Sequence, residues 1–109
     1  MTALEKAVHE RLVRAAKLFK RAESELLEAV QKAESLKLFR CFGYSSLFSY
    51  VVGELGLSEN VAFMVINVGR KAEQVPELKQ AIQQGELSLS KAKKITSVIT
   101  AANQAEWLK

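Results

Sequence analysis

The chain has 109 residues, a formal charge of +4, and apolar residues at about half of its positions. A chain of this length forms one domain with a packed core. One proline and five glycines are too few for a β-rich or disordered architecture. The mild positive charge permits a nucleic-acid partner without requiring one.

The residue types also exclude several classes of site. Cys41 and His9 are the single cysteine and the single histidine, so the chain has no internal disulfide and no zinc-ligand set. It has no glycine-rich phosphate loop and no nucleophile beside a base. No apolar run approaches the ~20 residues of a membrane span, and no apolar secretory core stands at the N-terminus. We therefore expect a cytoplasmic, non-catalytic protein without membrane contact, metal, cofactor or small-molecule ligand.

The first long stretch, residues 2 to about 35, predicts one helix. It lacks proline and glycine and is rich in strong helix formers, with Thr2 as a plausible cap. Apolar residues recur in it at alternating steps of three and four, which is the seven-residue repeat of a coiled-coil seam. In this seam large side chains alternate with alanine, so that two helices can approach closely: Leu12, Ala15, Phe19, Ala22, Leu26, Ala29, Ala33 and Leu36.

The length of this helix predicts how it is used. Some 33 helical residues span about 50 Å, whereas a compact body of this size has a diameter of roughly 35 Å. One end must then project beyond the body, and a projecting apolar seam needs a partner. We expect a homodimer built on this helix; the alternative is a helix that breaks near its middle and folds back. Residues 36–42 continue this helix or form a short second one, which places the domain boundary between residues 1–42 and 43–109.

The stretch Gly43–Arg70 has the pattern of a helix-turn-helix. Ser45 or Ser46 can cap a first helix, Gly56 can adopt the left-handed turn conformation, and Ser58 can cap a second helix that ends near Ala72. The pattern predicts two sets of positions. The inward set is Val51, Leu55, Leu57, Ala62 and Val65, and the outward set is Glu59, Asn60, Phe63, Met64 and Asn67.

The outward chemistry of this second helix conflicts with its shape. A helix that reads DNA offers Arg, Lys, Asn or Gln to bases and phosphates, but this helix offers Phe63 and Met64 and reaches Arg70 and Lys71 only at its end. Three interpretations stay open: DNA contact, a protein interface through Phe63 and Met64, or burial against the N-terminal helix.

The remainder of the chain predicts three more short helices. Pro76 begins the first, and Gly85 ends it. Ser88 or Ser90 caps the next, which places Ala92, Ile95, Val98 and Ile99 inward. Its outward lysines, Lys91, Lys93 and Lys94, form either a solvated face or a phosphate-contacting patch. Thr100 caps a last helix that contains Trp107, and the amphipathic pattern runs on to Lys109, as if the chain were cut from a longer one.

Several of these motifs, in this order, carry a family resemblance: GYSSLFSYVVGELGLSENVAF, VPELKQAIQQGELSLSKAKKI and TAANQAEWL. The region from about Leu36 to Leu108 resembles the helical N-terminal region of bacterial HNH endonuclease-like proteins, and more weakly the helical DNA-binding region of bacterial partitioning proteins. The resemblance implies a helical module that delivers a nuclease to DNA. The metal-binding histidines and paired cysteines of the nuclease have no counterpart here. The family's basic helix positions hold Phe63, Met64, Val65 and Ile66 instead.

The sequence predicts an all-α fold, with a long N-terminal helix followed by a bundle of short helices that contains a helix-turn-helix-like pair. Two functions are compatible with this fold. The first, favoured by the resemblance, is a dimeric module that binds double-stranded DNA. The second is a homo-oligomerisation or protein-interaction module that has lost DNA contact. The DNA-contact candidates are Asn60, Asn67, Arg70, Lys71, Lys91, Lys93 and Lys94. The interface candidates are Leu12, Ala15, Phe19, Ala22, Leu26, Phe63 and Met64.

Overall fold

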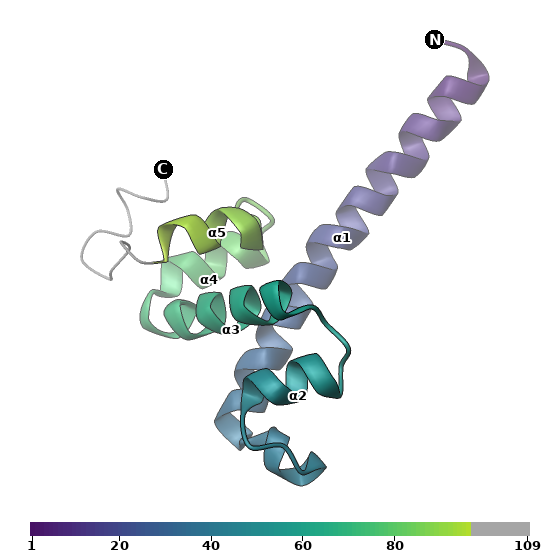
Figure 1. The fold of residues 1–109 in the computed structure, drawn as a ribbon. Coiled ribbons are helices and arrows are strands. Elements are labelled where there is room, and N and C mark those ends of the chain that lie inside the picture. Colours follow the sequence, from purple (N-terminus) through teal and green to yellow (C-terminus); the bar gives the residue numbers. More distant parts are fainter. Residues whose placement is uncertain (97–109) are drawn as a thin grey trace.

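The computed structural model describes residues 1–96 and shows an all-α fold (Figure 1). No strand occurs among these residues. This confirms the predicted fold class, a long N-terminal helix followed by short helices. In chain order the elements are α1 (Ala3–Leu36), the 3-10 helix η1 (Leu38–Phe42), α2 (Leu47–Gly53), α3 (Glu59–Gln74), α4 (Pro76–Gln83) and α5 (Leu89–Ile95).

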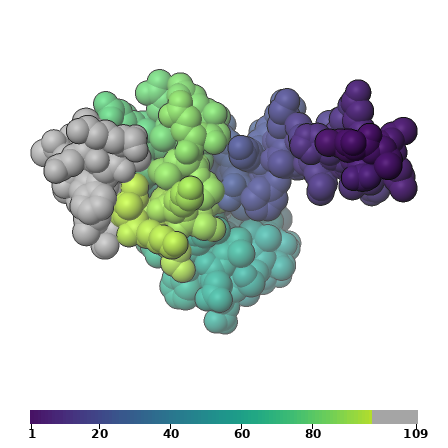
Figure 2. Space-filling model, turned by 90° about the horizontal axis from the view of Figure 1, so that it is seen from above, coloured from purple at the N-terminus to yellow at the C-terminus, as the bar shows by residue number. Residues whose placement is uncertain are grey.

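Helix α1 is a single unbroken helix of 34 residues. It begins with a capping box, in which the Thr2 side chain accepts from the Glu5 backbone and the Glu5 carboxylate accepts from the Thr2 backbone. It ends at Lys37, whose φ of 52° lies in the left-handed region. The alternative of a helix that folds back at its middle is therefore wrong. The N-terminal half projects from the body, and residues 1–22 are all exposed (Figures 1 and 2).

The C-terminal half of α1 belongs to the core of the body. Leu27, Val30 and Gln31 are buried where α1 crosses α3. The crossing is close because Gly69 of α3 has no side chain: a Cβ there would lie 3.4 Å from Gln31 Cγ and 3.5 Å from Leu27 Cδ1. Leu27 and Val30 of α1 thus belong to the same hydrophobic core as residues of α2, α3, α4 and α5.

Helices α2 and α3 are joined by a turn at Gly56, whose φ is +72°. The Ser46 hydroxyl caps α2 by accepting from the Ser49 backbone N–H at 3.0 Å, and the Ser58 hydroxyl caps α3 by accepting from the Val61 N–H at 3.2 Å. Helix α3 lies at the centre of the body and contacts α1, α2, α4 and α5.

Most of the predicted inward positions of this pair are confirmed. Val51, Ala62 and Val65 are buried and Leu57 is half-buried, but Leu55 is 46% exposed. The prediction for Leu55 is wrong because α2 ends at Gly53, so that Leu55 lies in the turn and not on the inward stripe of a helix.

The last two described helices complete the body. Pro76 begins α4 and Gly85 follows it with a φ of +77°. Ser88 caps α5 by accepting from the Lys91 N–H at 3.2 Å, so Ser88 and not Ser90 is the cap. Ala92 is buried and Ile95 is half-buried, as predicted. The predictions for Val98, Ile99, Thr100, Trp107 and Lys109 lie outside the described residues.

Candidate interaction surfaces

The projecting half of α1 presents an apolar seam to solvent. Leu12 is 63% exposed and Phe19 is 66% exposed. Ala15 lies between them on the same stripe, Ala22 follows Phe19, and both alanines are exposed. Leu18 is 62% exposed beside this stripe. Within residues 1–96 no element covers this stripe, because the turn at Gly85 lies beside Lys20 on another face of the helix. All four of these interface candidates are therefore free for a partner.

At its C-terminal end the same seam enters the body. Leu26 and Ala33 are half-buried and pack against the core, because α2 and η1 lie beside this part of α1. Leu26 is thus partly covered by its own chain, while the part of its side chain that stays exposed is still an interface candidate. Between α1 and α2 these residues line an apolar groove of about 200 Å³, called here the α1–α2 groove. Its lining is Leu26, Ala29, Val30, Ala33, Leu38, Leu47, Tyr50, Val51 and Leu55.

The exposed stripe of α3 contains three of the predicted DNA contacts. Asn60, Asn67 and Arg70 are exposed, whereas Lys71 is half-buried. Arg70 is already engaged, because its Nε lies 2.7 Å from Glu34 Oε1 of α1. This ion pair gives Arg70 a partner within the chain.

Phe63 and Met64 differ in their surroundings, although both were predicted to point outward. The Phe63 ring packs on the Phe48 ring of α2 with centroids 4.5 Å apart, and Phe63 is still 53% exposed. Met64 is half-buried and packs against the core. Met64 is less exposed than Phe63 because α5 packs against α3 at this side.

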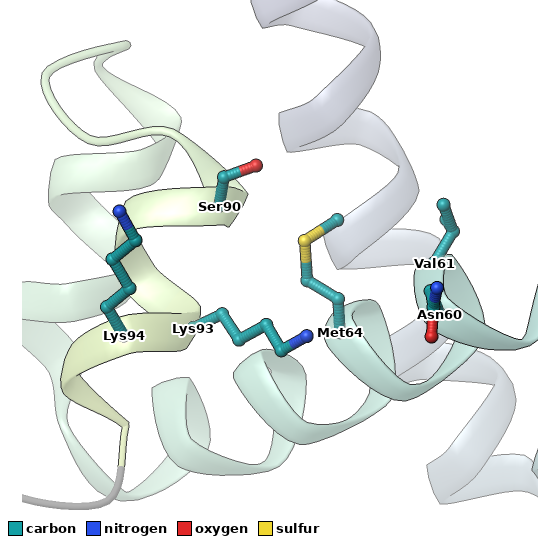
Figure 3. Close-up of a pocket in the computed structure, with 6 residues that line it drawn as sticks. All are labelled: Asn60, Val61, Met64, Ser90, Lys93 and Lys94. Atoms are coloured by element: carbon teal, nitrogen blue, oxygen red, sulfur yellow. The ribbon is translucent and has the colours of Figure 1, made fainter.

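A second groove, of about 530 Å³, lies between α3 and α5 and is called here the α3–α5 groove (Figure 3). It brings together three of the predicted DNA contacts, Asn60, Lys93 and Lys94. Figure 3 shows the Lys93 side chain extending from α5 toward Met64 on α3. Asn67, Lys71 and Lys91 do not line it. The complete lining is Asn60, Val61, Met64, Ser90, Lys93 and Lys94.

Sequence reasoning missed Val61 and Ser90 as members of this groove. The one signal in the sequence is the helical spacing from Asn60 to Met64 and from Ser90 to Lys94, which places each pair on one helix face. That spacing does not say which two helices lie together, so the groove itself follows only from the packing of α5 on α3.

Other types of site find no support in the described part of the chain. Among residues 1–96, no three His, Cys, Asp or Glu side chains come together to hold a metal ion. None of the helices in that range is long and apolar enough to cross a membrane.

Comparison with family models, with curated proteins and with solved structures finds no match to this chain. The surfaces described above therefore have to be interpreted from their own chemistry.

Proposed function

We propose that this chain is a non-catalytic homodimerisation module in which two copies of α1 pair through the exposed seam. The observation that supports this most directly is the exposure of Leu12 and Phe19, 63% and 66%, on a helix that projects beyond its own body. Burying one such side chain stabilises a contact by about 1.5–3 kcal/mol. An apolar stripe of this regularity on a free helix is the surface that a second helix covers.

The partner follows from the geometry of the seam. Among the described residues, the body covers the seam only from about Leu26 onward, so about 20 helical residues, or about 30 Å of helix, keep their seam uncovered. A second copy offers an identical seam of the same length. Two identical surfaces related by a two-fold axis form a closed dimer.

Light scattering across a range of concentrations tests this proposal. The expected species has twice the chain mass of 12.1 kDa. Phe19→Asp should convert it to a monomer, because it places a charge in the seam. Lys17→Asp, two residues away and on another face, is the control and should leave the dimer intact. A wild-type chain that stays monomeric at about 100 μM would overturn the proposal, since stable dimers of this size have dissociation constants well below that value.

A second candidate function is contact with double-stranded DNA, and the α3–α5 groove favours it. Lys93 and Lys94 stand there beside Asn60, which combines cationic groups for phosphates with an amide for a base edge. This candidate agrees with the resemblance to HNH endonuclease-like proteins, and it would make the chain the DNA-delivery module of such a protein in the cytoplasm. Two observations make DNA contact the second candidate. Arg70 already pairs with Glu34, and α3 lies at the centre of the body, where α1, α2, α4 and α5 contact it.

Titration of a short duplex at low and high salt separates the two functions. DNA binding through this groove predicts an affinity that falls steeply with salt and falls further in Lys93→Glu. Lys32→Glu is the matched control, because Lys32 is exposed on α1 and does not line the groove. If the dimer ignores the duplex at low salt, only the dimerisation module remains.

A further inference from the structure

The seam of α1 has two unequal rows of side chains. In heptad notation, Leu12, Phe19 and Leu26 occupy the a positions, whereas Ala15 and Ala22 occupy d positions. Val8, which is 48% exposed, continues the d row toward the N-terminus. From Leu12 to Leu26 the a row is therefore large, whereas the d row between them holds only Ala15 and Ala22.

This inequality distinguishes the two ways in which two copies can pair. In a parallel pair each position faces its own copy, so Phe19 meets Phe19 while Ala15 meets Ala15, and the distance between the helices would have to change within one turn. In an antiparallel pair an a position faces a d position. Leu12 and Phe19 then each face an alanine of the other copy, which keeps the helix separation constant over the centre of the pair.

We propose that the two copies of α1 pair antiparallel, with Phe19 of each copy opposite Ala15 of the other and Leu12 opposite Ala22. The inference rests on the proposed dimerisation and adds its orientation and register. The same register sets Leu26 opposite Val8 of the second copy. The two-fold axis then passes close to Leu18, and Leu18 of each copy faces its counterpart, which gives this 62% exposed residue a partner.

The charged residues that flank the seam fit the same register. In an antiparallel pair the g positions of the two helices face each other, as do the e positions. Arg11 then stands beside Glu25 of the second copy, so that this interaction occurs twice in the dimer. In a parallel pair Arg11 would face Ala16, and Leu18 would face Glu23, so no charge would be matched.

The far end of the second helix reaches the edge of the α1–α2 groove. The α1–α2 groove has Leu26 and Ala29 of the seam on one side and the exposed Leu55 on the other. In the antiparallel register, Val8 of the second copy arrives at Leu26, where the free seam enters this groove. In a parallel pair the groove would face the same groove of the other copy instead.

Spin-label distances between the two copies test the orientation. In a Cys41→Ser background, which removes the exposed native thiol, one cysteine is placed at Glu10→Cys or at Lys17→Cys and labelled. Both positions are on the outer face of the helix, one heptad apart, so the label does not touch the seam. The antiparallel register puts the two Lys17 positions level with each other and offsets the two Glu10 positions by about 21 Å along the axis. The measured distance should therefore be clearly longer for Glu10→Cys than for Lys17→Cys.

The alternative outcomes of this experiment separate two failures. Equal distances at the two positions in a dimer would show a parallel pair, which overturns the inference and leaves the proposed dimerisation standing. A monomeric mass without dipolar coupling at either position would overturn both.

Charge reversal gives an independent test of the register. Arg11→Glu and Glu25→Arg should each raise the dissociation constant of the dimer roughly tenfold at low salt, and the double variant should restore it. Both residues are exposed on α1, so the body should remain folded in each variant. If the dissociation constant of the double variant rises by the product of the two single-variant factors, the register is wrong.

Discussion

The Gln31 side-chain amide of α1 donates a hydrogen bond to the Gly69 carbonyl oxygen of α3 at 2.9 Å, across 38 residues of sequence. Gln31 is 8% exposed, and its side-chain carbonyl oxygen has no hydrogen-bond partner within the described residues. The Gln31 stem also lies against Gly69, where an added Cβ would be 3.4 Å from Gln31 Cγ. Gln31 therefore contributes both a hydrogen bond and packing to the crossing of α1 and α3.

Substitution at this crossing should show the cost of a buried charge. Gln31→Glu keeps the shape of the side chain but replaces the donor with a carboxylate that faces a carbonyl oxygen, and we expect it to lower the free energy of unfolding by about 2–4 kcal/mol at neutral pH. Gln31→Met also removes the donor, but it leaves no unpaired polar atom and should cost less than about 1.5 kcal/mol. Urea denaturation of both variants checks the difference. Equal losses would mean that volume and not polarity matters at this site.

The choice of capping serine can be tested at the start of α2. The Ser46 hydroxyl accepts the Ser49 N–H, so Ser46→Ala should lower the free energy of unfolding by about 1 kcal/mol. Ser45 is exposed and makes no capping bond to α2, so Ser45→Ala should change it by less than about 0.5 kcal/mol. Thermal denaturation of the two variants provides the measurement. The reverse order would assign the cap to the wrong serine.

The Phe48–Phe63 contact is expected to stabilise the α2–α3 pair, not the dimer. A double-mutant cycle with Phe48→Ala and Phe63→Ala should give a coupling free energy of about 0.5–1.5 kcal/mol, because the rings pack at 4.5 Å. The dimer dissociation constant of Phe63→Ala should stay within about twofold of the wild type. A large loss of dimer in this variant would place Phe63 in the interface, as the sequence suggested.

The Arg70–Glu34 ion pair should contribute little to stability. Its two side chains are 57% and 35% exposed, so Arg70→Gln should cost about 0.2–1 kcal/mol, and less at high salt. Lys71→Gln removes the same charge one residue away and serves as the control in the same denaturation series. If Arg70→Gln lowered the free energy of duplex binding by much more than it lowered the free energy of unfolding, Arg70 would have to be a DNA contact.

Local signals in the sequence were sufficient for most of the secondary structure. The stretch without proline and glycine determined α1, and Pro76, Gly85 and the serine caps located α4 and α5 to within a few residues. These features act over one or two turns of chain, so they do not depend on what the rest of the molecule does. For the same reason the apolar seam of Leu12 and Phe19 was visible at once as a helical repeat.

The tertiary structure alone decided which of these surfaces remain available. The heptad pattern runs through Leu26 as regularly as through Phe19, yet the body covers one and leaves the other in solvent, because coverage depends on where α2 packs. Likewise, Arg70 is a free cation in the sequence until the α1–α3 crossing brings Glu34 beside it. Asn60 and Lys93 share a groove only because α5 packs on α3. Contacts between residues distant in sequence depend on how the helices cross, and helical periodicity specifies the face of each helix but not the neighbour that it meets.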